Sequence, residues 1–172
     1  MSVAPIVSAR VSTPVGELDL ASDGRALVAV GLRTGSKAFR ADVEARTGQA
    51  VTAGSDKILD RAASELASYF DGRTKAFDVP IRFAWGTPFQ QRVWKAIAKV
   101  PFGESTTYGA LAVKVGSPGG FQAVGQATGA NPLGVIVPCH RVLQASGRMG
   151  GYGGGEDMKE WLLRHEGAAY RP

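Results

Sequence analysis

The sequence is poor in the residues that cross-link or metallate small proteins. It holds one cysteine and two histidines among 172 residues, so an internal disulfide is impossible, and Cys and His alone cannot complete a zinc site. No run approaches the roughly 20 apolar residues that a membrane span needs, and residues 1–11 lack the basic and apolar regions of a secretory signal. These absences predict a soluble, cytoplasmic protein without a metal and without a membrane partner.

Composition limits the number of domains, and the charge is unevenly distributed along the chain. With 44% hydrophobic residues, the chain can form one large domain or two small ones, each with its own core. Residues 1–84 carry 11 basic and 10 acidic side chains, and residues 85–172 carry 9 and 5, so most of the net charge of +5 lies in the second part. A phosphate-binding surface shows such an excess, but so do many proteins that bind no nucleic acid.

The first part of the chain has the pattern of a small sheet with helices. Alternating apolar residues predict strands, and Asp23-Gly24 is typical of a tight turn between two of them, which indicates antiparallel pairing. Pro80 confines one further strand to an edge of the sheet. We expect strands at 6–11, 18–21, 26–32 and 76–83, and helices over 37–46 and from the Asp56 cap to Gly72.

A change of composition near Trp85 predicts a domain boundary, with domains at 1–84 and 85–172. Thr87 can cap a helix that has Pro88 at its first position. Short helices over 108–115 and 121–129, joined by a glycine-bearing turn, are consistent with a helix-turn-helix, although most helical hairpins bind no DNA. A closing amphipathic helix is expected over 157–165, with Met158, Trp161 and Leu162 inward.

The cysteine and one histidine are neighbours, Cys139 and His140. A thiol reacts as the thiolate, and an adjacent imidazole can favour that form near neutral pH, so Cys139 is a candidate nucleophile. A lone cysteine after the apolar run 135–137 can equally be a small buried hydrophobe. From these residues alone both interpretations stay open.

A glycine-rich segment follows the cysteine. Residues 146–155 contain six glycines around Tyr152, which predicts a loop whose backbone can approach a ligand closely. The segment lacks the terminal Gly-Lys-Ser/Thr of a phosphate loop, and no dinucleotide fingerprint occurs at a strand-to-helix turn. No cofactor is therefore predicted.

Several short motifs, taken in order, resemble the O6-alkylguanine-DNA alkyltransferases, the suicide DNA-repair proteins. The resemblance covers nearly all of residues 85–167 and is looser in the first domain. It rests on Thr87-Pro88-Phe89-Gln90, Val93-Trp94, Tyr108-Gly109, Asn131-Pro132, Pro138-Cys139-His140-Arg141-Val142, Gly150-Gly151-Tyr152 and Lys159-Glu160-Trp161-Leu162-Leu163.

The resemblance implies an α+β (α/β) fold, with a ribonuclease-H-like supporting domain followed by a mostly helical domain that carries a winged-helix-like helix-turn-helix. It also implies single-turnover transfer of an alkyl group from O6 of guanine in DNA to Cys139, with O4 of thymine as a second candidate atom. His140 would act as the base through a water molecule, since adjacent side chains on one strand point to opposite faces. Glu166 would orient the imidazole, although a solvated carboxylate at a helix end is the plainer interpretation.

The remaining implied roles concern the leaving group and the substrate. Tyr108 would protonate the departing guanine, where a core or capping aromatic is the alternative. Asn131 would hold the turn under the site by bonding backbone, as a simple Asn-Pro turn also would. The base would be read beside Val142, Tyr152 and Gly153. Contacts to double-stranded DNA, in its minor groove, are implied for Gln90, Tyr108, Gly109, Ser117 and Gln122, in a protein that acts as a monomer.

One position departs from the family pattern. Gln122 stands where the family usually has an arginine that enters the base stack in place of the flipped nucleotide. Glutamine lacks the charge and the broad plane of a guanidinium. Two alternatives to duplex repair therefore stay open: a cysteine that accepts alkyl groups from a free base or small molecule, and a non-catalytic module that binds alkylated DNA. The presence of Cys139 argues against the second.

Overall fold

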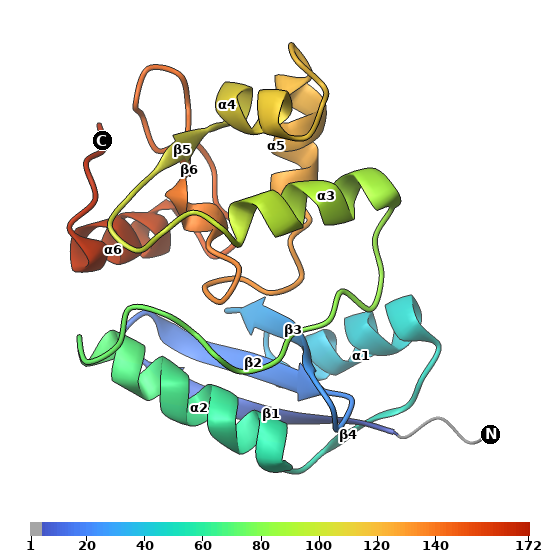
Figure 1. The fold of residues 1–172 in the computed structure, drawn as a ribbon. Coiled ribbons are helices and arrows are strands. Elements are labelled where there is room, and N and C mark those ends of the chain that lie inside the picture. Colours follow the sequence, from blue (N-terminus) through green and yellow to red (C-terminus); the bar gives the residue numbers. More distant parts are fainter. Residues whose placement is uncertain (1–4) are drawn as a thin grey trace. The chain divides into compact units, whose positions relative to one another are not determined.

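The chain divides into two compact units, residues 1–85 and 86–172. The computed structural model describes residues 5–172 (Figure 1). Within the described residues, no helix is both long enough and apolar enough to cross a membrane. The expected α+β class is confirmed, since a small sheet with two helices is followed by a mainly helical unit.

The first unit is built on a four-stranded sheet. Its strands are β1 (Ile6–Thr13), β2 (Gly16–Ser22), β3 (Leu27–Leu32) and β4 (Val51–Ala53). The order is β3-β2-β1-β4; the first three pair antiparallel, as the alternating pattern predicted, and β4 runs parallel to β1. The sequence analysis missed β4, because three residues are too short a run to show alternation.

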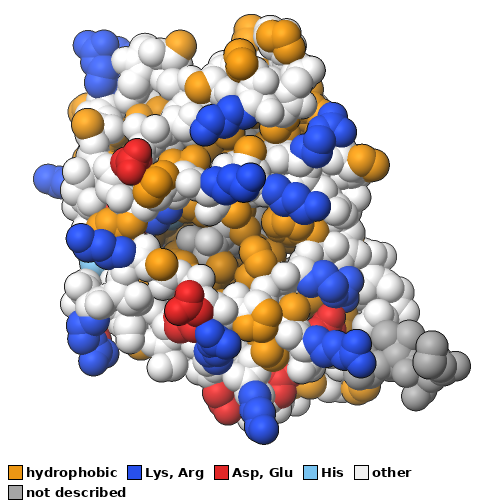
Figure 2. All heavy atoms as spheres, in the orientation of Figure 1, with side chains coloured by type: hydrophobic (Ala, Val, Ile, Leu, Met, Phe, Trp, Pro, Cys, Tyr) orange, Lys and Arg blue, Asp and Glu red, His pale blue; other side chains and the backbone are white. Residues whose placement is uncertain are grey.

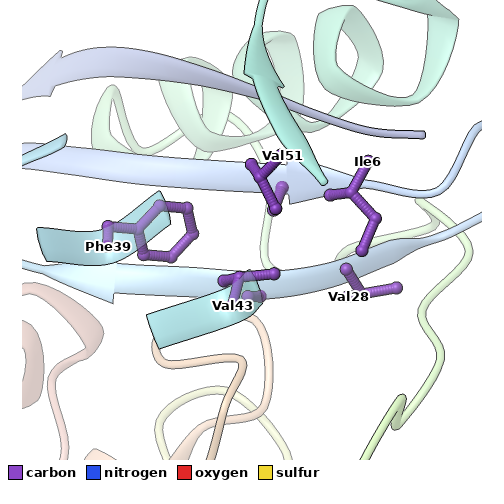
Figure 3. Close-up of a cluster of buried hydrophobic side chains, with 7 residues drawn as sticks. Ile6, Val28, Phe39, Val43 and Val51 are labelled. Carbon is purple, nitrogen blue, oxygen red and sulfur yellow. The ribbon is translucent and has the colours of Figure 1, made fainter. Parts of the chain in front are cut away.

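Both faces of the central strand β2 are covered. Side chains alternate along a strand, so Leu18 and Leu20 face away from Asp19 and Ala21, and all four are buried. Helix α1 (Ser36–Thr47) contributes Phe39 and Val43 to a cluster with Ile6, Ala21, Val28, Ala29 and Val51 (Figure 3). Helix α2 (Lys57–Phe70) packs on β1, β2 and β3, and its first turn is capped by Asp56, whose carboxylate accepts the Leu59 N–H.

The strand expected over 76–83 is wrong. Only an isolated bridge between Ile81 and Leu27 forms there. Pro80 has no N–H to give to a ladder, and the N–H groups of Asp78 and Val79 donate instead to the carboxylate of Glu65 on α2. A helix side chain thus takes the hydrogen bonds that a neighbouring strand would have needed.

The second unit packs three helices beside a short two-stranded ribbon. Helices α3 (Pro88–Ile97), α4 (Tyr108–Lys114) and α5 (Phe121–Gly129) contact one another, and the indole of Trp94 on α3 donates 2.7 Å to the Ala127 carbonyl on α5. Strands β5 (Thr106–Thr107) and β6 (Val142–Leu143) pair in parallel, and helix α6 (Glu156–Glu166) closes the unit. The expected capping of α3 by Thr87 is confirmed, as a full capping box.

The turn between α4 and α5 is tight enough to require glycine. A Cβ added at Gly120 would clash with the Ser117 hydroxyl oxygen and would lie 2.9 Å from the Ser117 carbonyl oxygen. Gly116 and Gly119 both have positive φ, of 78° and 80°, which L-residues with side chains rarely adopt. The two helices of the expected helix-turn-helix are therefore joined as the sequence indicated.

Candidate active site

A strained turn leads into the cysteine. Val135 has φ 70°, one of two such non-glycine residues in the part of the chain described, and a β-branched side chain in this region is costly. The side chain of Asn131 holds the turn closed: its amide donates 2.9 Å to the Val137 carbonyl, and its oxygen accepts the Leu133 N–H at 3.0 Å. Asn131 thus fixes the backbone on which Cys139 begins.

Cys139, His140 and Arg141 form a single turn of 3₁₀-helix, η1 (Cys139–Arg141). The expectation that Cys139 and His140 lie on one strand is wrong. A 3₁₀ turn has about three residues, so the three side chains leave the backbone in three directions, and all three are buried. This geometry sends the imidazole and the guanidinium into the interior toward α6.

The last residue of α6 receives both groups. Glu166 Oε2 lies 2.8 Å from His140 Nε2, and the guanidinium of Arg141 donates to Oε1 at 2.7 Å and to Oε2 at 2.9 Å. Arg141 also donates to the Val100 carbonyl. A carboxylate only accepts, so Nε2 carries the imidazole proton. The opposite nitrogen of the ring, Nδ1, is buried without a hydrogen-bond partner among residues 5–172.

The charge state of His140 suits a base. Burial lowers the pKa of His140, and the hydrogen bond and charge of Glu166 only partly oppose this. The imidazole is therefore neutral near pH 7, with its lone pair on Nδ1 available to take a proton. The ring of Tyr152 meets the imidazole edge to face, at 6.4 Å between centroids.

The thiol itself rests protonated. Cys139 is 8% exposed, and burial raises the pKa of its thiol, while a hydrogen bond from Asn131 and the positive charge of Lys159 act in the opposite direction. A base is consequently required to make the thiolate during a reaction. Cys139 is thus a buried, protonated thiol next in sequence to a neutral imidazole, and it becomes a nucleophile only when a base takes its proton.

Tyr108 lies near both the thiol and the glycine-rich loop. The pKa of Tyr108 is raised by partial burial and, secondarily, by the charge of Cys139. A Cβ built at Gly150 would lie 3.5 Å from the Tyr108 hydroxyl oxygen, so this hydroxyl also reaches the loop. Tyr108 begins α4, and Thr107 caps that helix by accepting the Ala110 N–H.

Two family models match this chain almost end to end. The ribonuclease-like domain of 6-O-methylguanine DNA methyltransferase matches residues 6–83, and the DNA-binding domain of the same proteins matches residues 88–168. A methylated-DNA–protein-cysteine methyltransferase from Mycobacterium tuberculosis is 42% identical over 156 residues, which is 91% of this chain and 89% of that protein. The chain belongs to the 6-O-methylguanine DNA methyltransferase family.

Two further relatives show how much of the chain the similarity covers. The protein of the same name from Salmonella typhimurium is 49% identical, but the match spans 105 residues, which is 61% of each chain. A crystal structure described as Mycobacterium tuberculosis OGT in complex with DNA has a TM-score of 0.81 and 40% identity, and the match covers 94% of this chain and 92% of that one. The shared fold of this methyltransferase family extends over both units.

The residues expected to face DNA in this family member are spread over α3, α4 and α5. Gly109 and Gln122 are exposed, whereas Ser117 is partly buried in the turn. The side-chain oxygen of Gln90 accepts the Thr87 N–H within the capping box, so that atom is engaged in the helix cap. Gly153 is exposed in the glycine-rich loop, and Val142 is buried.

The sequence analysis gave no role to two buried cations of the site. Arg141 shares Glu166 with His140, as described above. Lys159 of α6 is fully buried, and its Nζ donates to the Val142 carbonyl at 2.7 Å and to the Gly151 carbonyl at 3.3 Å. Burial lowers the pKa of Lys159 to about 8. Lys159 follows Met158 on the inward face of an amphipathic helix, and this position in the sequence could have indicated that the lysine is buried.

Proposed function

We propose that this chain repairs DNA by direct reversal, moving an alkyl group from O6 of guanine to the sulfur of Cys139 in a single irreversible turnover. The observation that carries the proposal is the buried hydrogen bond between His140 and Glu166, made by the residue next to the buried thiol of Cys139, in a chain with no second thiol. Membership of the methyltransferase family supports the same reaction.

The proposed reaction balances in atoms and protons. The bond from sulfur to the alkyl carbon forms as the bond from that carbon to O6 breaks, in an in-line displacement. His140 Nδ1 takes the thiol proton through a water molecule, and the Tyr108 hydroxyl donates a proton to the leaving guanine. The tyrosine then regains a proton from the imidazolium, so the net change moves one proton from sulfur to guanine. The product is a thioether, which explains the single turnover.

The substrate would be held by backbone as much as by side chains. Val142 and Gly153 would present main-chain groups to the guanine, with Tyr152 packed beside it, and Asn131 would keep the turn beneath them rigid. The alkyl group arrives with the damaged base, so the reaction as written draws on no cofactor or metal.

Duplex DNA is the proposed partner. A thiol cannot reach O6 inside the stack, so the nucleotide must be flipped out at a cost of a few kcal/mol. We place α5 in the minor groove of a duplex bound by a monomer, with residues 85–172 carrying DNA binding and transfer and residues 1–84 supporting them. The proposed DNA contacts are Gln90, Tyr108, Gly109, Ser117 and Gln122.

Gln122 favours a second candidate function. An exposed glutamine on α5 offers less stacking surface than a guanidinium, so a free alkylated base or another small alkyl donor could be the better substrate. The thiol chemistry would be unchanged. Only the route by which the alkyl carbon reaches Cys139 differs between the two functions.

Intact mass after incubation with a methylated oligonucleotide separates these functions. We expect a duplex with one O6-methylguanine to add a methyl group, about 14 Da, to a peptide containing Cys139. Mass gain from O6-benzylguanine base but none from DNA would favour the small-donor function. No gain from either substrate would overturn alkyl acceptance altogether.

Gln122→Arg is expected to speed reaction with O6-methylguanine in duplex DNA more than reaction with free O6-benzylguanine. The guanidinium adds a charge and a plane that can stack on bases, and both matter only when a stack must be opened. Single-turnover rates on the two substrates check this. Equal changes on both would show that residue 122 plays no part in opening the duplex.

Lys159→Gln is expected to slow reaction with free O6-benzylguanine about tenfold at pH 7, which corresponds to roughly one unit in the pKa of Cys139. Glutamine can still donate to the Val142 carbonyl, but the positive charge that favours the thiolate is gone. The difference should narrow above pH 8, because the Lys159 pKa of about 8 leaves the wild-type side chain neutral there.

A pH series of single-turnover rates provides the measurement for Lys159. Lys99→Gln is the matched control, since Lys99 is exposed and its replacement removes the same charge from a side chain with no proposed contact to a free base. A gap between Lys159→Gln and wild type that persisted unchanged to pH 10 would contradict the electrostatic role.

A further inference from the structure

Two large hydrophobic side chains are strongly exposed among the described residues, Phe121 at 55% and Val113 at 66%. Scattered exposed apolar residues are ordinary, but Phe121 is a full aromatic ring at the first position of α5. It directly precedes Gln122, which the family resemblance places against DNA. An exposed aromatic ring at this position is therefore available for contact with DNA.

Phe121 shares a face of α5 with Gly125, a residue that lies close to Tyr108. Residues four apart share one face of a helix, so Phe121 is above Gly125 by about one turn, or roughly 5.4 Å. A Cβ added at Gly125 would lie 3.9 Å from a ring carbon of Tyr108. Tyr108 in turn is close enough to Cys139 for the thiolate charge to raise its pKa, after burial. The exposed ring thus stands one helical turn from the Tyr108 side of the site.

The surroundings of Phe121 suit a polyanion. No Asp or Glu occurs between Glu104 and Glu156, a stretch that includes α4, α5 and the glycine-rich loop. Lys114 ends α4 and is exposed. On the face drawn in Figure 2, blue Lys and Arg side chains and orange hydrophobic ones gather over the region of α3, α4 and α5, where red acidic side chains are scarce.

We propose that Phe121 enters the DNA base stack when the target nucleotide leaves it, as the residue that holds the flipped state open. Apolar wedges that part base steps are a general device of proteins in the minor groove, and an aromatic ring stacks on any base. Gln122 can then hydrogen-bond exposed base edges, while the neighbouring ring provides the stacking surface. The inference rests on the proposed repair of duplex DNA.

Phe121→Ala tests this role through a ratio of rates. We expect the rate on O6-methylguanine in duplex DNA, divided by the rate on free O6-benzylguanine, to fall about tenfold, because a lost base–aromatic stack is of that order. On a single-stranded oligonucleotide with the same lesion, where no pair has to be opened, the fall should be much smaller. Phe121→Trp should restore the duplex rate, because it keeps an aromatic plane.

Val113→Ala is the matched control, since it removes exposed apolar surface from the neighbouring helix without touching the ring. It should leave all three rates unchanged. An unaltered duplex ratio in Phe121→Ala, or equal losses on duplex and single-stranded DNA, would overturn the proposal. Failure of the proposed duplex repair would look different, because the wild-type protein would then gain no mass from methylated duplex DNA, whatever it gained from the free base.

Discussion

Replacement of Cys139 by alanine should abolish the mass gain of about 14 Da that methylated DNA is expected to produce. The chain has no other thiol, and a thioether is the stable product that the proposed chemistry requires. The loss should be complete rather than partial, because alanine supplies no atom that can accept the alkyl group. Intact mass of both proteins after incubation with the same methylated duplex measures it.

The structure supplies a sharp control for this experiment. His140 Nδ1 is a second buried nucleophilic atom at the site, and it has no hydrogen-bond partner among the described residues. A residual mass gain in Cys139→Ala, mapped to His140, would show that the imidazole and not the thiol accepts the group. Alanine fills nearly the volume of cysteine, so the thermal unfolding midpoint should change little. Wild type should stop at one methyl group per chain however much DNA is added.

Local signals in the sequence were enough to predict most helices. Asp56 before α2 and Thr87 with Pro88 before α3 are caps whose effect depends on residues three positions away. The helix over 121–129 was likewise bounded by a glycine turn and by Asn131-Pro132. Where the contacts that fix a helix end lie within one turn of the chain, the local sequence is enough to predict that end.

Elements decided by distant partners were not predictable in this way. The segment 76–83 has a strand-like composition, but Glu65 accepts the N–H groups of Asp78 and Val79. Trp161 was expected inward, yet it is partly exposed and stacks on His165, with 4.8 Å between ring centroids. Fully buried Lys159 occupies the inward face beside Met158 instead. Helical periodicity predicts which side chains face inward only to within about one residue. It also predicts that a lysine is exposed to solvent, which is wrong for Lys159.

The environment of Glu166 shows the same limit at the site. A carboxylate at a helix C-terminus opposes the helix dipole, which favoured a solvated side chain. In the structure Arg141, 25 positions earlier in the chain, brings a guanidinium to the same carboxylate as His140. The dipole term of less than about 1 kcal/mol is small beside a buried, bidentate ion pair. The partner of His140 was named only through the family resemblance.

Glu166→Gln is expected to slow alkyl transfer by about 100-fold or more, in line with the loss seen when a residue that fixes a catalytic histidine tautomer becomes an amide. The carboxylate holds the proton on His140 Nε2 and leaves Nδ1 free to accept one. A glutamine NH₂ placed beside Nε2 would donate to it and move the ring proton to Nδ1. His140→Ala should be similarly slow, because the two residues act as a unit.

The same substitution should also cost stability. The carboxylate accepts three donors, one from His140 and two from Arg141. Glutamine offers one oxygen, so one buried donor of Arg141 must face another donor and the guanidinium loses its counter-charge. Removing one partner of a buried pair typically destabilises by about 3–5 kcal/mol. Glu160→Gln, on the same helix, should have little effect, because the amide oxygen can still accept the Tyr170 hydroxyl.

A double variant separates the loss of stability from the loss of chemistry. In Arg141→Met/Glu166→Gln both buried charges are removed together, so neither is left buried without its counter-charge, which is the main cost of breaking such a pair. We therefore expect the unfolding midpoint to recover relative to Glu166→Gln alone, while the transfer rate to free O6-benzylguanine stays low. Recovery of both would mean that Glu166 serves only the fold. Recovery of stability alone would assign the carboxylate to His140, because the rate would then depend on which ring nitrogen carries the proton.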